Sequence, residues 1–407
     1  MAVSELLREA VRAVRAHALR SVLTLLGIII GVATLVAVVS VIAGLNVFIK
    51  DRVFQLAPDV YVLSKFGIIR GRDEFLDALK RPDITWRDYE RLAATLTRAE
   101  AVAAEAVGNT VVKRRDRRLA DVRLQGTSAN YGPMVRLDVV AGRYFTPAEG
   151  EAGLAVAVIG SDLEEELFPQ VDPLGRELLV GGTPYRVIGV LARQGRVLGE
   201  ERDRKLFIPI RAYQRQLGSR ESLNVLIRAR GGVEGLEASV DEARAMLRAL
   251  RHTGFRAPDP FGVITAESLQ ELWRQISTAA FVLSLLIASV SLGIGGIVIM
   301  NIMLVSVVER TKEIGLRLAL GARKRDIRRQ FLVEAALLSL AGGVVGVVLG
   351  GLAALGVRGG LDFPADVTPG IIVAGLLLSA GVGLAAGYWP ARSASNLPVV
   401  DALRAEA

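Results

Sequence analysis

Four long runs without a charged residue constrain this chain more than any other feature of its sequence. They cover residues 21–49, 275–308, 335–357 and 367–391, with lengths of 29, 34, 23 and 25 residues. A helix needs about 20 apolar residues to cross a bilayer, and a cleaved signal sequence has an apolar stretch of only about 7–15. Four such runs also argue against buried helices of a large soluble protein. We therefore predict an α-helical membrane protein with spans at 21–49, 275–308, 331–357 and 367–391.

The basic residues predict the orientation of these spans. Residues 1–20 carry four arginines, and residues 309–330 carry eight lysines and arginines. Because basic loops stay on the cytoplasmic side, we place both termini, including the tail 392–407, and the 309–330 loop there. Residues 50–274 then lie outside the cell or in the periplasm of a bacterium. The net charge of +8 thus reflects membrane topology and does not indicate nucleic-acid binding.

Residues 50–274 combine helix and strand patterns, so we predict a large α+β extracytoplasmic domain inserted between the first two spans. Strand patterns at 59–63, 101–112, 223–229 and 261–265 accompany helical periodicity at 85–96 and 233–251. We divide the domain into a two-part α+β subdomain, 50–112 and 215–274, and a β-rich insert, 113–214. Residues 177–180 and 185–191 flank a Gly-Gly pair and predict a hairpin. Residues 193–205 are polar and predict an exposed loop.

The sequence contains none of the common catalytic or phosphate-binding motifs that we searched for. The chain has no cysteine, two histidines and no Gly-Lys dipeptide, which excludes a Walker A phosphate loop and thiolate chemistry. The acidic run Glu164, Glu165 and Glu166 has no metal-ligand spacing and predicts a solvated helix face. We expect no catalytic residue, no metal site and no cofactor bound directly. A membrane-anchored enzyme stays as the weakest alternative.

Two glycine series fall within the apolar runs. They are Gly27 and Gly31 in the first run, and Gly342, Gly346 and Gly350 in the third. Small residues four apart let membrane helices approach closely, so we predict that these glycines pack helices together. The alternative is that they are merely tolerated by lipid. Glu334 stands at the start of the third span, where we expect it to pair with a basic neighbour.

Residues 300–350, MNIMLVSVVERTKEIGLRLALGARKRDIRRQFLVEAALLSLAGGVVGVVLG, carry the most specific signal. This segment closely resembles the MacB/FtsX-type permease of ABC transporters. The segments RSVLTLLGIIIG (20–31), AGRYF (141–145), DPLG (172–175), YRVIGVL (185–191) and YWPARSAS (388–395) are similar to the same family. The resemblance therefore runs along the whole chain in order.

The resemblance implies a dimer of permeases, homomeric or heteromeric, and a coupling helix in the 309–330 loop that docks on an ATPase subunit. Independently of the resemblance, Gly315 and Gly321 indicate that the 309–330 loop can break into short helices. The ATPase-coupling residues carried over from the family are Glu309, Arg310, Thr311, Glu313, Gly315, Gly321, Ala322, Arg323, Asp326 and Ile327. Residues 1–20 have the pattern of an amphipathic helix at the cytoplasmic membrane surface.

Only 20 residues precede the first span, so we expect a separate cytoplasmic ABC ATPase subunit to bind ATP and Mg. The expected function is that of a permease subunit of a MacB-like exporter, working by mechanotransmission. A periplasmic adaptor and an outer-membrane channel are further possible partners. The alternative is a non-transporting regulator of the FtsX or lipoprotein-release type, which acts on envelope processes.

Overall fold

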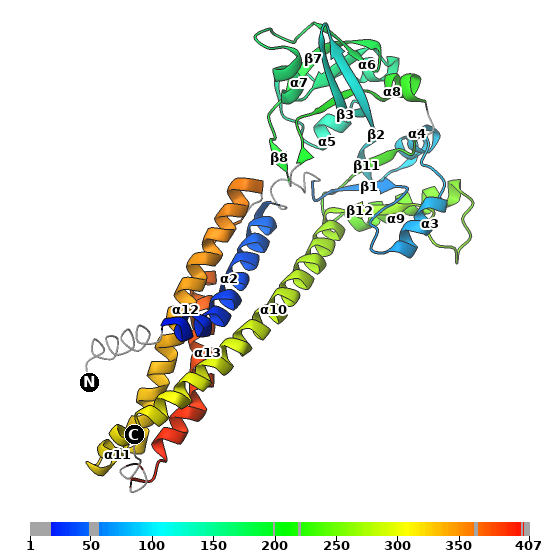
Figure 1. Ribbon diagram of the computed structural model, residues 1–407. Helices are drawn as coiled ribbons and strands as arrows, with labels where there is room; N and C mark the ends of the chain where they lie inside the picture. Colours follow the sequence, from blue (N-terminus) through cyan, green and yellow to red (C-terminus); the bar gives the residue numbers. More distant parts are fainter. Residues whose placement is uncertain are drawn as a thin grey trace. The chain divides into compact units, whose positions relative to one another are not determined.

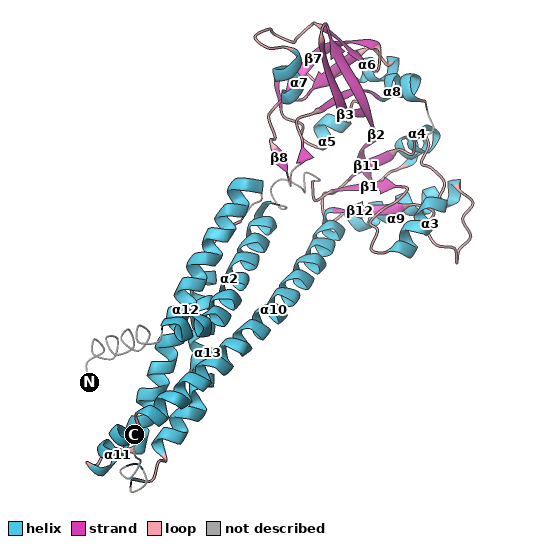
Figure 2. Cartoon of the chain, viewed as in Figure 1, coloured by secondary structure: helices cyan, strands magenta, loops and turns pink. Residues whose placement is uncertain are grey.

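The computed structural model describes residues 18–48, 57–197, 200–218, 221–361, 365–399 and 402. The chain divides into two compact units, Met1–Phe48 with Gln275–Ala407 and Ile49–Arg274. Figure 2 shows helices throughout the first unit and a mixture of strands and helices in the second. We call them the membrane unit and the outer unit. Most of the predicted amphipathic helix at 1–20 lies outside the described residues.

Four long helices and one short one build the membrane unit. Among the described residues they are α2 (Ala18–Phe48), the part of α10 (Ala266–Glu309) from Gln275 onward, α11 (Thr311–Ala319), α12 (Lys324–Leu361) and α13 (Pro369–Ser395). By length and composition α2, α10, α12 and α13 can each cross a bilayer, and the α+β unit is inserted between the first and second of them. These observations confirm the predicted fold class.

The helices extend beyond the uncharged runs. The 44 residues of α10 give a length of about 66 Å, against about 30 Å for the hydrocarbon core of a bilayer. This helix begins at Ala266, inside the segment that we assigned to the outer domain. Helix α12 begins at Lys324, inside the predicted 309–330 loop. Charged residues at helix ends do not stop a helix, so charge-free runs underestimate helix length.

Glycines bring α2 into close contact with two neighbours. A Cβ atom added to Gly27 would lie 2.8 Å from the backbone nitrogen of Gly295 on α10. On the other side, a Cβ at Gly346 would lie 2.9 Å from the carbonyl oxygen of Ile29, and one at Gly350 would lie 2.6 Å from that of Ala33. Such distances leave no room for a methyl group. Helix α2 is therefore held between α10 and α12 by direct backbone contact (Figure 1).

Helices α12 and α13 pack against each other in the same way. A Cβ at Gly383 of α13 would lie 2.0 Å from the hydroxyl oxygen of Ser339, and one at Gly343 of α12 would lie 2.2 Å from that of Ser379. Both hydroxyls donate to carbonyls of their own helix, at Ala336 and Leu376. These small polar residues are therefore satisfied locally while allowing close approach.

The outer unit is built on a ten-stranded sheet. Its order is β12-β1-β11-β2-β3-β10-β5-β7-β4, with β6 pairing with both β2 and β7. The strands are β1 (Val60–Ser64), β2 (Ala99–Arg114), β3 (Arg117–Thr127), β4 (Val139–Gly142), β5 (Val156–Ile159), β6 (Glu177–Val180), β7 (Thr183–Leu191), β10 (Lys205–Pro209), β11 (Asn224–Ala229) and β12 (Gly262–Thr265). Two further short strands, β8 (Arg196–Val197) and β9 (Glu200–Glu201), pair with each other.

The two faces of this sheet bury different cores. One face packs against helices that contribute Leu92, Leu163, Tyr213 and Leu247 to a single cluster. These helices are α4 (Trp86–Thr95), α7 (Ser161–Leu167), α8 (Ile210–Leu217) and α9 (Leu236–Leu250). The other face carries a smaller cluster that includes residues of α5 (Tyr131–Met134). The remaining helices are α3 (Arg72–Lys80) and α6 (Pro147–Ala152).

Several local predictions are confirmed. Thr85 caps α4 with a capping box, in which its hydroxyl accepts from the backbone amide of Asp88 and the Asp88 carboxylate accepts from that of Thr85. Strands β6 and β7 form the hairpin expected around the Gly-Gly pair. Glu165 and Glu166 lie on α7, where they pair with Arg193 and Arg204.

Strands of both predicted subdomains belong to one sheet. The 16-residue strand β2 extends past residue 112, where we divided the domain, and pairs with β11, β3 and β6. The segment 193–205 is not simply an exposed loop. Asp203 is 2% exposed, and its carboxylate accepts from the backbone amides of Gln194 and Gly195 at 2.8 and 2.7 Å.

The glycine contacts predict opposite effects at two adjacent positions. Gly350→Ala places a methyl group against the backbone of α2 and should destabilise the membrane unit by about 1–3 kcal/mol, less the gain in helix propensity. At Gly351 the added methyl group would meet no other atom within 4 Å. Gly351→Ala should therefore stabilise the membrane unit slightly, through the higher helix propensity of alanine. Thermal unfolding of both variants in nanodiscs should give a lower midpoint for Gly350→Ala alone. Equal midpoints would contradict close packing at this site.

Glu149 predicts a pH-dependent contribution to stability. The Arg143 guanidinium, with bonds of 2.7 Å, and the capping bonds from Thr146 lower the pKa of Glu149 from 4.5 to about 2. Because the folded-state pKa is the lower one, the contribution is full above about 4.5 and is lost as the pH falls towards 2.

Glu149→Gln should therefore cost about 1 kcal/mol at pH 7, and the difference from the wild type should shrink at acid pH. Thermal melts across this range measure it. Glu151→Gln, an exposed change in the same helix, is the matched control. If Glu149→Gln is less stable than the wild type by the same amount at every pH, the stabilisation does not come from the ionised Glu149 carboxylate.

Candidate functional site

The ten residues assigned to ATPase coupling lie on one continuous stretch of the membrane unit. The stretch comprises the last turn of α10, the nine residues of α11 and the first turn of α12. It is mostly helical, and the chain leaves helical structure at Arg310 and again at residues 320–323. Charged residues and short helices thus occupy a segment that the sequence presented as a loop.

Gly321 ends α11 in a specific way. Its φ angle of +97° is one that residues with a side chain rarely adopt, and no atom lies within 4 Å of its ideal Cβ position. The backbone amide of Gly321 donates to the carbonyl of Leu318 at 3.1 Å, and that of Ala322 donates to Arg317 at 3.0 Å. This pair of bonds is a Schellman motif. Gly321 is therefore required as the residue that turns the chain towards α12.

Gly315, by contrast, does not break the helix. It lies in the middle of α11, and a Cβ there would approach the Cβ of Ala402 to 2.6 Å. Ile314 on the same face is 2% exposed and belongs to a cluster with Ile327 and Phe331 of α12. Our expectation for Gly315 was therefore wrong, because its small size serves packing. The inner face of α11 is fixed against the membrane unit.

A chain of polar contacts ties α11 to α12. Arg317 pairs with Glu313 one turn earlier and donates to the amide oxygen of Gln330 at 2.9 Å. Gln330 donates to Glu334 at 3.2 Å, and the Glu334 carboxylate lies 3.4 Å from the guanidinium of Arg310. The expected basic partner of Glu334 is thus Arg310. These contacts link the end of α10, the helix α11 and the start of α12 into one connected set.

The outer surface of α11 is exposed and has an apolar centre. Leu316 is 54% exposed and Leu320 is 80% exposed, one helical turn apart. Lys312, Glu313 and Arg323 are exposed around them. An apolar centre with a charged rim is the usual pattern of a protein–protein interface. We refer to these five residues as the α11 outer surface.

The structure therefore separates the predicted coupling residues into two groups. Glu309, Glu313, Gly321, Arg323 and Asp326 are exposed, whereas Gly315 and Ile327 are buried. Arg310, Thr311 and Ala322 are half-buried. The exposed residues can contact a partner, and the others can only position the helix.

The sequence-based prediction missed Leu316, Leu320 and the polar contacts of Arg317 and Gln330. The signal was present as Leu316 and Leu320, which stand four residues apart in a segment rich in basic residues. Apolar residues at that spacing share one helix face, which in a basic cytoplasmic segment indicates a contact surface. The spacing of Glu313 to Arg317 and of Gln330 to Glu334 likewise indicates pairs within single helices.

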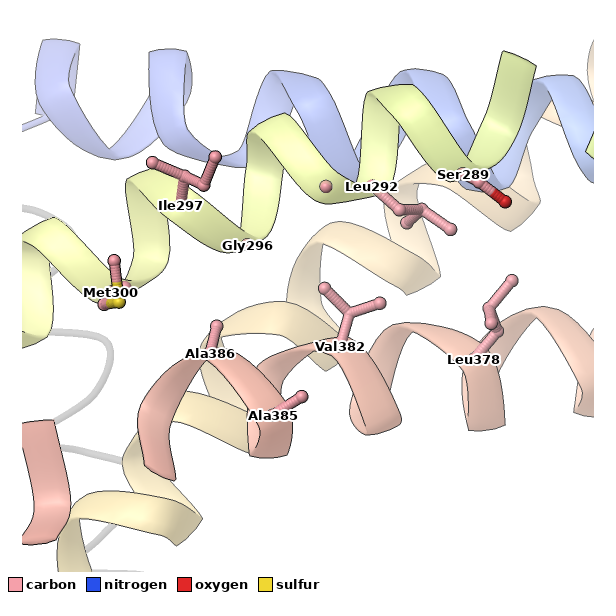
Figure 3. A pocket seen from close by; sticks show the side chains of 10 residues that line it. Ser289, Leu292, Gly296, Ile297, Met300, Leu378, Val382, Ala385 and Ala386 are labelled. Atoms are coloured by element: carbon pink, nitrogen blue, oxygen red, sulfur yellow. The ribbon is translucent and has the colours of Figure 1, made fainter. Parts of the chain in front are cut away.

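The membrane unit contains a groove between α10 and α13 (Figure 3). It has a volume of about 450 Å³ and is lined mostly by small and aliphatic residues, among them Gly296, Val382 and Ala386. Its one hydroxyl, on Ser289, donates to the carbonyl of Leu285 in its own helix. The groove therefore offers apolar contact and no reactive group.

The described residues offer no metal centre. No group of three or more histidine, aspartate or glutamate side chains in this part of the chain is placed to hold a metal ion.

Comparison with protein families gives two matches that together span most of the chain. Residues 21–250 match the MacB-like periplasmic core domain, and residues 285–399 match the FtsX-like permease C-terminal domain. The second match includes α11 and the α11 outer surface. The first match includes α2 and the strands of the outer unit from β1 to β11.

Curated relatives support the same assignment. A macrolide export ATP-binding/permease protein MacB of Bdellovibrio bacteriovorus is 32% identical over 408 residues and matches 99% of this chain. A protein of the same name from Azoarcus sp. is 35% identical over 405 residues, also 99% of the chain. The chain spans about three fifths of the length of these relatives, 62% and 60%.

Among solved structures, the periplasmic region of MacB from Actinobacillus actinomycetemcomitans aligns with 55% of this chain and 96% of its own. The two are 15% identical with a TM-score of 0.45. Because the first family model covers more than half of the chain and the second covers most of the remainder, the chain belongs to the family of MacB-like, FtsX-type ABC transporter permeases.

Proposed function

We propose that this chain is the permease subunit of a MacB-like ABC exporter. In this proposal a separate cytoplasmic ATPase subunit binds ATP and Mg, docks on the α11 outer surface and drives motion of the outer unit. The observation that carries the proposal is the pairing of an exposed surface with a fixed inner face on one short helix. Such a helix can receive force from a partner without being displaced from its own bundle.

The contacts of α11 give a route for that force. Glu313 and Arg317 connect the helix to Gln330, and Glu334 connects α12 to Arg310 at the end of α10. A displacement of α11 therefore acts on α10 and α12 together. Helix α10 continues from Glu309 to Ala266, where strand β12 ends one residue earlier. One unbroken helix thus connects the coupling region to the sheet of the outer unit by covalent structure.

The arrangement in the cell is part of the proposal. We place the membrane unit in the bacterial cytoplasmic membrane with both termini in the cytoplasm, and the outer unit in the periplasm or outside the cell. The basic 309–330 segment supports this orientation. We further propose that two permeases form a homodimer or heterodimer. The names of the curated relatives favour export over a purely regulatory role, with an adaptor and an outer-membrane channel as possible partners.

Docking on the α11 outer surface predicts the effect of two leucine substitutions. Leu316→Ala and Leu320→Ala remove exposed apolar side chains and should each weaken ATPase binding about tenfold, since central interface residues typically contribute more than 1 kcal/mol. Binding and stimulated ATP hydrolysis should be measured in nanodiscs with candidate ABC ATPase subunits from the same genome.

Leu377→Ala is the matched control, because Leu377 is 68% exposed but lies within the spanning helix α13. It should leave both measurements unchanged. If all three variants bind the ATPase like the wild type, the α11 outer surface is not the docking site. If the wild type itself does not stimulate hydrolysis, the proposed function fails as a whole.

The regulatory alternative makes a different prediction for the same complex. Proteins that co-purify with the full chain in its membrane would include a cell-wall hydrolase or a sensor kinase. An exporter would instead retain a periplasmic adaptor. The result distinguishes the two functions whatever the outcome of the leucine substitutions.

A further inference from the structure

A polar pocket in the outer unit has no place in the coupling mechanism. It has a volume of about 290 Å³ and lies on the sheet face that carries the smaller core cluster. Basic residues in its lining outnumber acidic ones, since it contains Arg123, Arg202, Arg204 and Lys205 but only one acid, Glu105. Arg204 also pairs with Glu166, which does not line the pocket. Apolar side chains complete the wall.

Strand register explains why these charges meet. Lys205 of β10 lies directly beside Arg123 of β3, and Phe207 lies beside Gln125 two residues further on. Side chains two residues apart on a strand share a face, so all four side chains emerge on the same side of the sheet. On the next strand, Glu105 of β2 accepts from the amide of Gln125 at 2.8 Å. Three adjacent strands thus form a charged floor.

Glu105 is already held by the protein. Besides Gln125, the hydroxyl of Tyr131 donates to it at 2.9 Å and the amide of Asn224 donates at 3.4 Å. It is 9% exposed, and burial raises the pKa of its carboxyl. This acid therefore already accepts from three neutral donors, and its one carboxylate also interacts electrostatically with Arg123 and Lys205.

The basic side chains of the floor are less well compensated. Lys205 donates to the side chain of Gln194 at 2.8 Å, and burial lowers the pKa of its ammonium group to about 8. For the Arg123 guanidinium, the described part of the chain supplies no hydrogen bond and no ion pair. Arg123 is exposed and lines the pocket, so its guanidinium is accessible to an anion that enters, and hydrogen bonds between a guanidinium and an anion are among the stronger ones.

The apolar part of the lining defines the rest of the ligand. Val62, Leu226 and Phe207 lie on the neighbouring strands, and Leu137 and Leu269 contribute from outside the sheet. Leu226 and Phe207 are nearly fully buried, whereas Leu137 and Val62 are half-buried. These residues offer an apolar wall next to the two cations.

We propose that this pocket binds a small amphipathic anion. Its carboxylate or phosphate group is held by Arg123 and Lys205, and its apolar body packs against Phe207 and Leu226. The same chemistry is offered by the head group of an anionic lipid and by a soluble organic acid. The proposal shares no residue with the α11 outer surface, so it stands or falls independently of ATPase docking.

The test uses the full chain in phosphatidylcholine nanodiscs and para-trifluoromethylbenzoate as the probe, followed by fluorine NMR. The uncharged para-trifluoromethylbenzyl alcohol and inorganic phosphate serve as matched probes that lack the charge or the apolar body. Benzoate should bind saturably, and the other two should bind at least about tenfold more weakly, because each loses one half of the contacts. Equal affinity for either one would overturn the proposal.

Substitutions locate the site. Arg123→Gln and Lys205→Gln should each weaken benzoate binding about tenfold, the usual effect of removing one charged hydrogen bond, whereas Lys205→Arg should largely preserve it. Arg118→Gln is the control, since Arg118 is exposed on the same strand and does not line the pocket. Thermal midpoints check that each variant is folded. If Arg123→Gln binds the probe no differently from Arg118→Gln, the pocket does not hold the anion.

Lipid composition then identifies the source of the natural ligand. Replacing part of the phosphatidylcholine with phosphatidylglycerol should displace the benzoate if the pocket receives a lipid head group. Unchanged benzoate affinity would assign the pocket to a soluble acid. Both results retain the binding chemistry, and each names a different ligand.

Discussion

Backbone contact through glycine determines the arrangement of the membrane unit. In a bilayer there is little hydrophobic gain when one apolar helix leaves lipid for another, so close packing must supply much of the attraction. Gly27 on one side of α2 and Gly346 and Gly350 of α12 on the other remove the side chains that would keep the helices apart. The remaining elements of the unit are positioned relative to this three-helix contact.

The segment that contains α11 depends on that packing in turn. Ile314 of α11, Ile327 and Phe331 of α12, and Val307 of α10 belong to the same buried cluster as Ile28 and Val32 of α2. The short helix is therefore a continuation of the packed membrane core with one face left open. Gly321 contributes a backbone turn, and the polar contacts around Gln330 and Glu334 fix the angle at which the helices meet.

Much of this organisation could be predicted from the sequence, because the signals are local. Charge-free runs revealed the four spanning helices, and the Thr85 cap and the β6–β7 turn depend on a few adjacent residues. Residue type alone could not reveal the role of Gly315, since a glycine that breaks a helix and one that accommodates Ala402 look alike. The polar pocket was equally hidden, because strand register between distant segments brings Glu105, Arg123 and Lys205 together.

The position of β1 in the sheet has a consequence for how the protein is made. Its five residues leave the ribosome soon after the first spanning helix, yet their partners on both sides, β11 and β12, follow about 160 and 200 residues later. During that interval β1 has two unpaired edges, each a template for wrong pairing. The sheet closes only when Thr265 has been synthesised, one residue before α10 begins. Completion of the outer unit and insertion of the second spanning helix are therefore consecutive events in biogenesis.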